Sequence, residues 1–179
     1  MATPDTSAAP TKIGEFTLNW QNGFEIDVAG TKDPAEADSA QWAKLAAGIN
    51  NFTPSLNETT TNDVYMDGEG FGSTDVTGKR LQIAFTGHRL EGNTAQDYIA
   101  SHVLDIGDKL KTLGRWTQTD GSTIVGQITL SNIVTSGGAP GAKQTLSFTM
   151  AFNGKPVYTA ATPKDVTPPD DGTDTTPKA

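Results

Sequence analysis

The chain has 179 residues, enough for one domain of ordinary size with short tails. Its formal net charge of −8 argues against a protein that grips nucleic-acid phosphates or an anionic membrane over its whole surface. Cysteine is absent, which excludes disulfides, cysteine-based metal sites and thiol nucleophiles. We find no apolar run of membrane-spanning length and no N-terminal secretory signal, so we expect maturation in the cytoplasm.

Both ends of the chain are rich in proline and small polar residues. Residues 163–179 hold four of the ten prolines, and Val166 is their one sizeable apolar side chain. Such segments bury too little apolar surface to offset the entropy lost on ordering. We therefore predict a flexible N-terminal arm over residues 1–11, a single domain over residues 12–162, and a disordered or linker-like C-terminal tail over residues 163–179.

Between the tails, apolar and polar residues mostly alternate, which is the pattern of strands with one buried face. The alternating runs cover residues 16–20, 24–28, 81–86, 124–130 and 145–152, and a short last strand is expected at 156–158. Asn22-Gly23 separates the first two runs and predicts a hairpin turn there. Because each run offers one apolar and one polar face, an antiparallel sheet is expected.

Two segments have helical rather than alternating spacing. Residues 38–49 combine helix-forming residues with an apolar face, which predicts a short helix. Residues 94–106 predict a longer one, in which Thr94 caps the start, Asp97 returns the capping hydrogen bond and Gly107 ends the helix. The expected fold class is therefore mainly β, or α+β, with one flanking helix over about residues 94–106.

A long segment with weak periodicity occupies about residues 50–78, where only Val64-Tyr65-Met66 suggests a strand. We therefore expect a long inter-strand loop. Loops of this length in compact domains are usually functional or disordered. The apolar side chains of this segment need a surface to bury against, which either the parent domain or a neighbouring subunit must supply.

Motifs for catalysis and metal binding are weak. The segment that starts at Asp67 superficially resembles an EF-hand loop, but its twelfth position is Gly78 instead of a bidentate carboxylate. His88 is expected at a strand end and His102 as a partly buried, hydrogen-bonded residue, and a G-x-S-x-G motif is absent. We predict no enzyme, no catalytic residue, no bound metal and no cofactor.

Two further groups have alternative readings. Glu25 and Asp27 are two residues apart in an expected strand and so share its polar face. Such a pair could be the acid and base of a glycosidase, but without an aromatic cleft we interpret it as a solvated acidic stripe. Trp20, Trp42 and Trp116 could line a sugar-binding platform, and core packing is the interpretation we favour.

Several short motifs follow one another in order along residues 11–160. They are W-A-K-L-A-A-G-I at 42–49, N-x-x-x-x-x-D-V-Y-M-D-G-E-G at 57–70, V-T-G-K-R at 76–80, T-G-H-R-L-E-G-N-T-A-Q-D-Y-I at 86–99, S-G-G-A at 136–139 and F-N-G-K-P at 152–156. In this order they resemble the major tail tube protein of long-tailed, non-contractile (siphovirus-type) bacteriophages. Asn93 stands where the family pattern has an acidic residue, and asparagine caps and turns similarly.

The resemblance implies a β-sandwich or barrel-like subunit that forms hexameric rings, which stack into the tail tube of a virion assembled in the host cytoplasm. The tube is then the conduit for ejection of double-stranded DNA, which passes without specific binding. Other implied partners are the tape measure, distal tail and terminator proteins, and no membrane is involved. A channel wide enough for duplex DNA needs more strands than one such chain supplies, which favours a ring.

On this reading the long segment makes the ring-to-ring contacts. The candidate residues are Phe52, Leu56, Asn57, Glu58, Asp63, Tyr65, Asp67, Glu69, Phe71 and Asp75. Glu25 and Asp27 are candidates for an acidic lumen that repels phosphate. The alternatives are a carbohydrate-binding or adhesion β-sandwich module and another virion component, such as a capsid decoration or tail-terminator protein.

Overall fold

The computed structural model describes residues 16–161, so the predictions for residues 1–11 and 163–179 lie outside the described part. The strands there are β1 (Gly23–Asp27), β2 (Trp42–Lys44), β3 (Ile49–Ser55), β4 (Thr59–Val64), β5 (Gly72–Gly78), β6 (Gln82–His88), β7 (Lys111–Thr117), β8 (Thr123–Val134), β9 (Thr145–Phe152) and β10 (Val157–Thr159). The α-helix is α1 (Thr94–Ser101), and the 3-10 helices are η1 (Asn19–Gln21), η2 (Pro34–Ser39), η3 (Met66–Gly68) and η4 (Gly107–Leu110).

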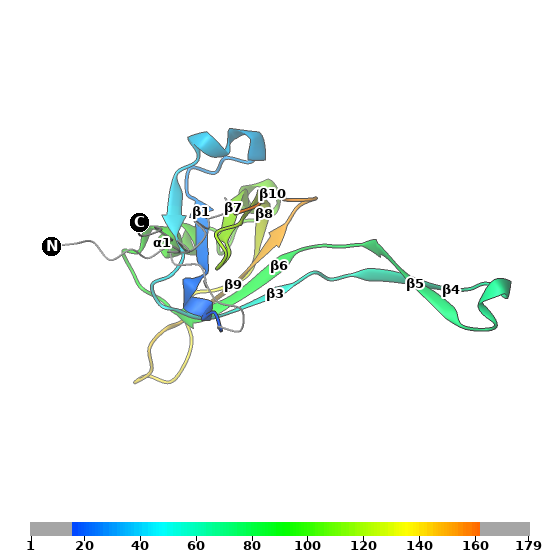
Figure 1. Ribbon diagram of the computed structural model, residues 1–179. Coiled ribbons are helices and arrows are strands. Elements are labelled where there is room, and N and C mark those ends of the chain that lie inside the picture. The colour runs from blue at the N-terminus through cyan, green and yellow to red at the C-terminus, as the bar shows by residue number, and fades with distance from the viewer. Residues whose placement is uncertain (1–15, 162–179) are drawn as a thin grey trace, which may run out of the picture.

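Eight strands form one antiparallel sheet in the order β2-β1-β7-β8-β9-β6-β3, with β10 added beside β8 (Figure 1). The long strand β8 organises this sheet. Its first half pairs with β7 on one edge and with β10 on the other, and its second half pairs with β9. The edge strands β2 and β3 follow each other directly in the chain, so residues 45–48 join the two ends of an open sheet.

The sheet folds back on itself. Phe24 on β1 and Phe85 on β6 are separated by three strands in the pairing order, which in a flat sheet would place them about 19 Å apart. Their ring centroids lie 4.9 Å apart in an edge-to-face contact, and Phe52 on β3 lies 4.7 Å from Phe24. The result is a sandwich-like fold without a closed barrel. The predicted fold class, mainly β with a flanking helix, is confirmed.

The alternation along the central strands selects the core. The inward side chains of these strands that are almost fully buried are Ile83, Phe85, Ile128, Leu130, Leu146, Phe148, Met150 and Phe152. Burying a side chain of this size contributes about 1.5–3 kcal/mol. The strands predicted at 24–28, 81–86, 124–130 and 145–152 are confirmed, because one face of each period-two run has this core to pack against. The short strand predicted at 156–158 is confirmed as β10, which pairs with β8 although its side chains are exposed.

Strand β7 is absent from the sequence prediction. Its alternation is interrupted at Gly114, where a Cβ atom would lie 2.7 Å from Cε of Met150 and 2.9 Å from Cγ2 of Ile128. The neighbouring strands therefore fill the place of a side chain at this position. A residue without a side chain at an inward position leaves no apolar signal in the sequence.

The strand predicted at residues 16–20 is wrong. Phe16 and Trp20 are 97% and 75% exposed, and the chain forms η1 here before it enters β1. Both edges of β1 are already paired, one with β2 and the other with β7. A preceding strand therefore has no edge to join, and Asn22-Gly23 forms no hairpin despite its sequence.

The helix predicted at residues 38–49 is also wrong, because the chain forms η2 and then β2 in this region. Trp42–Lys44 pair with the open edge of β1, and Trp42 lies beneath the guanidinium of Arg115, 4.4 Å from the ring centroid. Backbone pairing with β1 thus overrides the helical preference of the segment. Gly48 then turns the chain into β3 with a φ of +77°.

The predicted flanking helix exists but is shorter than 94–106, since α1 ends at Ser101. Its cap is Asn93 instead of Thr94, and the Asn93 side chain accepts a hydrogen bond from the Gln96 amide at 3.1 Å. Past Ser101 the chain exposes Leu104 and Ile106, so a further helical turn has no body surface to cover. Gly107 begins η4 and does not end α1.

Gln96 on α1 ties together two corners of the sheet. Its buried side-chain amide donates to the Ala47 carbonyl at 2.7 Å and accepts from the Leu90 amide at 2.7 Å. Arg89 forms an ion pair with Asp97 beside it. The A-Q-D segment, residues 95–97, thus holds both the β2–β3 and the β6–α1 connections in place. This is the structural role of that motif.

The expected loop at residues 50–78 is instead a long β-ribbon, so this prediction is wrong. β3 and β6 leave the body as a pair, and β4 and β5 continue them as a two-stranded sheet (Figure 1). Of Val64-Tyr65-Met66, only Val64 belongs to a strand. The ribbon escapes sequence detection because no side chain of β4 is buried on either face, and alternation appears only where one face is buried.

We expect Gln96→Leu to destabilise the subunit by about 1–3 kcal/mol, because it leaves the Ala47 carbonyl and the Leu90 amide without their partner. Urea unfolding at a concentration where the protein is monomeric measures the effect. Gln144→Leu, at an exposed position, is the matched control and should change stability by less than about 0.5 kcal/mol. Equal stabilities of the two variants would contradict the role given to Gln96.

Candidate assembly surfaces

We call residues 57–80 the arm, because they project beyond the body of the subunit (Figure 1). The arm continues the β3–β6 pair through the Arg80 amide, which donates to the Leu56 carbonyl at 2.7 Å. The side chain of Asn57 also donates to the Arg80 carbonyl at 3.2 Å. A two-stranded ribbon on its own is at best marginally stable in water, so packing on a second surface stabilises the arm.

The arm tip, residues 64–71, gathers exposed apolar side chains. Met66 and Phe71 are almost wholly exposed, and more than half of Val64 and of Tyr65 is exposed. Glu69, with a φ of +49°, forms part of the tight turn that places these residues at the tip. Exposed apolar groups at the end of a projecting element mark an interaction surface.

The distal arm is also strongly acidic. Residues 59–78 contain Asp63, Asp67, Glu69 and Asp75 and no lysine or arginine. Glu58 at the base differs from them, because it forms an ion pair with Lys79 at 2.9 Å. The part of the arm farthest from the body therefore carries uncompensated negative charge beside apolar side chains.

The arm brings together most of the residues predicted for ring contacts. Tyr65, Asp67, Glu69 and Phe71 all lie at the tip, as that prediction requires, and their role in contacts between rings stays a prediction. Phe52 does not belong to this group. It packs on Phe24 at the core, so its apolar surface is largely covered already.

Asp27, predicted to line an acidic lumen, is fully buried, so this part of the prediction is wrong. Its carboxylate accepts hydrogen bonds from the backbone amides of Ala29 at 3.0 Å, Thr31 at 2.6 Å and Gln41 at 2.7 Å. Burial alone raises the pKa of Asp27, but these donors outweigh it and hold the pKa below its ordinary value. The carboxylate thus organises the connection from β1 to β2.

Glu25 is partly exposed, but its charge is paired. Its Oε2 lies 2.5 Å from the guanidinium of Arg115, which also covers the ring of Trp42. The pair spans the neighbouring strands β1 and β7, where Glu25 is opposite Arg115. A lumen-facing role for Glu25 stays a prediction, and the ion pair reduces the net charge it would present there.

The tryptophans do not offer a common sugar platform. Trp116 stacks on Phe24 with ring centroids 5.8 Å apart and donates its Nε1 hydrogen to Asn22 at 2.9 Å. Trp42 is covered by Arg115. Trp20 is exposed and Trp42 lies outside the core cluster, so the expected core packing holds for Trp116 alone among the three.

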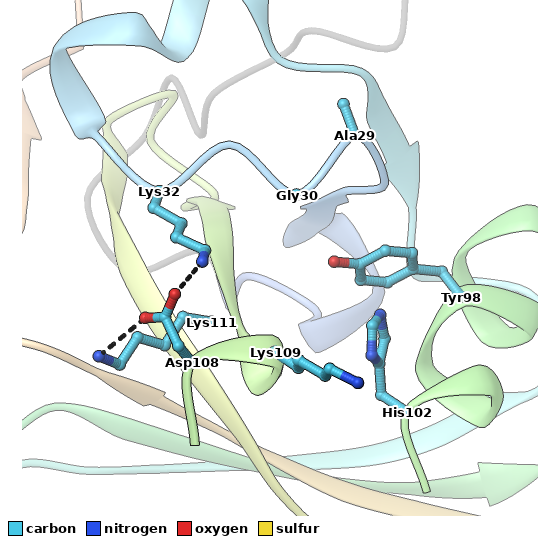
Figure 2. Close-up of a pocket in the computed structure, with 8 residues that line it drawn as sticks. All are labelled: Ala29, Gly30, Lys32, Tyr98, His102, Asp108, Lys109 and Lys111. Atoms are coloured by element: carbon cyan, nitrogen blue, oxygen red, sulfur yellow. Dashed lines mark hydrogen bonds and ion pairs between the residues drawn. The ribbon is translucent and has the colours of Figure 1, made fainter. Parts of the chain in front are cut away.

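A basic hollow of about 240 Å³ lies on the body between the β1–η2 connection, α1 and η4 (Figure 2). Its charged lining consists of Lys32, Lys109, Lys111 and Asp108. Lys32 and Lys111 both form ion pairs with Asp108, the second at 3.2 Å.

The other wall of the basic hollow is aromatic. Tyr98 extends into it from α1 and His102 from the position directly after α1, and the two rings contact each other edge to face with centroids 4.6 Å apart (Figure 2). His102 is partly buried and its Nδ1 lies 2.9 Å from Oδ2 of Asp105, which confirms the sequence interpretation of this histidine. Burial raises the pKa of Tyr98, so its hydroxyl stays protonated at neutral pH.

Within residues 16–161, no group of three or more histidine, aspartate or glutamate side chains is arranged to hold a metal ion. No helix in the same range is both long and apolar enough to cross a membrane.

We expect Asp27→Asn to destabilise the subunit at pH 7, and to do so by a smaller amount at pH 3. The folded-state pKa of Asp27 lies below its unfolded value, so the charged form stabilises the fold fully above about pH 4. That contribution is lost as the pH falls through the folded-state pKa. Thermal unfolding of both proteins at the two pH values measures it, with exposed Asp38→Asn as the control. A gap of equal size at both pH values would contradict the assignment.

Comparison with known proteins gives the fold. No protein-family model and no curated protein matches this chain. A chain from the tail of an empty gene transfer agent (GTA) particle, resolved with C6 symmetry, matches at a TM-score of 0.65 and 16% identity over 81% of this chain and 100% of that one. A chain from the virion of a native GTA particle matches at 0.63 and 15%, with the same coverage. The subunit therefore has the fold of chains found in a virion tail.

Proposed function

We propose that this protein is the building block of a tail tube, in which six copies form a ring and rings stack into a hollow cylinder. The observation that carries the proposal is the arm, which leaves the body with an apolar, acidic tip that its own subunit does not cover. The role is structural, and no enzymatic step is assigned to it.

Self-association is favoured because the apolar side chains of the arm tip are not buried within their own subunit. Met66 and Phe71 keep almost all their surface in water in the isolated subunit. Covering apolar surface contributes about 25 cal/mol per Å², which rewards contact with another copy. The open edges of β2 and β3 offer further unpaired backbone groups that neighbouring copies can use.

The geometry favours a head-to-tail contact. An arm that packs on the body of a neighbouring copy makes a heterologous contact, which generates either closed rings or continuing stacks. The fold likeness to a chain in a C6-symmetric tail supports rings of six. Rings that stack through their arms would form a tube of variable length, with other tail proteins needed at its ends.

A tube of this kind would conduct double-stranded DNA without holding it. A net charge of −8 provides few cations for phosphate, and binding to DNA grows with the number of lysine and arginine contacts. Glu25, although paired with Arg115, is the surviving candidate from the sequence for the lumen surface. The passage of DNA is the reason that a weakly binding interior would be useful.

The carbohydrate-binding alternative has no specific support in the described residues, since Trp42 and Trp116 are covered and the basic hollow is lined by three lysines. A different virion component remains compatible with the fold. Electron microscopy of the purified protein separates these functions, because a tube protein forms hollow cylinders and a glycan-binding module stays monomeric.

Removing the arm should abolish tubes and leave a folded subunit. Replacing residues 57–80 with Asn-Gly joins Leu56 to Leu81 by a two-residue turn that suits the β3–β6 pair. Because the core lies wholly in the body, circular dichroism should show an unchanged fold, while electron microscopy shows no cylinders. Tubes of normal length from this variant would contradict the proposed role of the arm in assembly.

The tip itself should matter through its apolar surface. Met66→Ser with Phe71→Ser should raise the concentration needed for polymerisation about tenfold or more, since the contact loses two apolar side chains. Met66→Leu with Phe71→Tyr, which keeps large side chains at both sites, is the matched control and should polymerise like the wild type. Light scattering across a concentration series measures both.

A further inference from the structure

We propose that the basic hollow is the receptor for the arm tip of a neighbouring copy in the next ring. This inference rests on the proposed function and names the surface that the arm binds. The receptor comprises Lys32, Lys109 and Lys111, the rings of Tyr98 and His102, and the exposed residues Leu104 and Ile106 of the segment that joins α1 to η4.

Charge complementarity is the first argument. The distal arm carries four carboxylates and no cation over residues 59–78. The lining of the hollow has three lysines for one carboxylate, Asp108, and Asp105 lies beside it in contact with His102 and Lys109. In a protein of net charge −8 this local excess of lysine is a suitable counterpart for an acidic tip.

Lys109 is the cation most available to a partner. It is 75% exposed, and its one ion pair, with Asp105, is long at 3.6 Å. Lys32 and Lys111 share the single carboxylate of Asp108, so each can contact a second acidic group without losing its first. Carboxylates such as Asp67 and Glu69 are the acidic groups of the tip.

The second argument is the exposed apolar surface of the segment between α1 and η4, two elements that contribute to the lining of the hollow. Leu104 and Ile106 are 92% and 85% exposed, although they lie between α1 and η4 on the body of the subunit. Both surfaces thus combine large exposed apolar side chains with charge, and the sign of the charge is opposite. An interface of this kind has an apolar centre and a polar rim that sets its register.

Position is the third argument. The arm leaves one side of the body, whereas α1, which forms a wall of the hollow, lies on the opposite side (Figure 1). A subunit therefore cannot place its own tip in its own hollow. The tip of one copy and the hollow of the next can meet repeatedly along an axis, which is the arrangement that stacked rings require.

Reciprocal charge reversal tests the pairing. The arm variant carries Asp67→Lys and Glu69→Lys, and the receptor variant carries Lys32→Glu and Lys109→Glu. In each variant alone, tip and hollow have the same sign, so the concentration needed for polymerisation should rise about tenfold or more. Mixing the two variants, or combining all four substitutions in one chain, restores opposite signs and should restore tubes.

Matched controls reverse as many charges elsewhere on the body. Glu36→Lys with Glu91→Lys imitates the arm variant, and Lys143→Glu with Lys155→Glu imitates the receptor variant, all at exposed positions. Both controls should polymerise like the wild type. Electron microscopy and sedimentation velocity measure assembly, and circular dichroism verifies the fold of every variant.

The outcomes separate the two proposals. If the wild type forms no cylinders, the proposed function fails and the receptor fails with it. If the wild type forms cylinders and the receptor variant does so equally well, the receptor assignment is overturned while the function stands. If both single variants fail but neither the mixture nor the fourfold variant recovers, tip and hollow do not meet, and the receptor is again overturned.

Discussion

The contact between Phe24 on β1 and Phe85 on β6 is the packing on which the rest of this structure depends. It folds an open sheet over on itself, so that Phe52 and the inward residues of β8 and β9 share one core. Folding the sheet brings its edge strands β2 and β3 to a common corner. There Gln96 forms hydrogen bonds with one backbone group of the β2–β3 connection and one of the β6–α1 connection. From that corner β3 and β6 can run outward together and carry the arm.

The body and the arm differ in how much apolar surface they bury. The body completes a core of its own, and its buried Asp27 carboxylate is hydrogen-bonded to three backbone amides. The arm has no core at all, and its tip combines the apolar side chains of Met66 and Phe71 with uncompensated carboxylates. In the proposed tube, such a subunit is stable alone through its body and binds other copies through its arm.

Particular elements explain where local sequence was a sufficient guide and where it was not. The runs that form β6, β8 and β9 alternate because one face of each meets the core. The run at residues 16–20 alternates equally well, yet both edges of β1 are occupied and the segment stays unpaired. For residues 42–44, pairing with β1 outweighs helical preference, and β7 was missed because the inward position 114 is a glycine filled by its neighbours.

The sequence by itself determined the fold class, the central strands, the existence of α1 and the acidic, apolar character of residues 50–78, because composition and period depend on which faces are buried. Only the tertiary structure decided that this segment is a projecting ribbon and that the Asp27 carboxylate is buried in the β1–β2 connection. It also decided that Lys32 and Lys109 line the same hollow. These properties depend on pairing between residues far apart in the chain, and a local pattern carries no information about its distant partner.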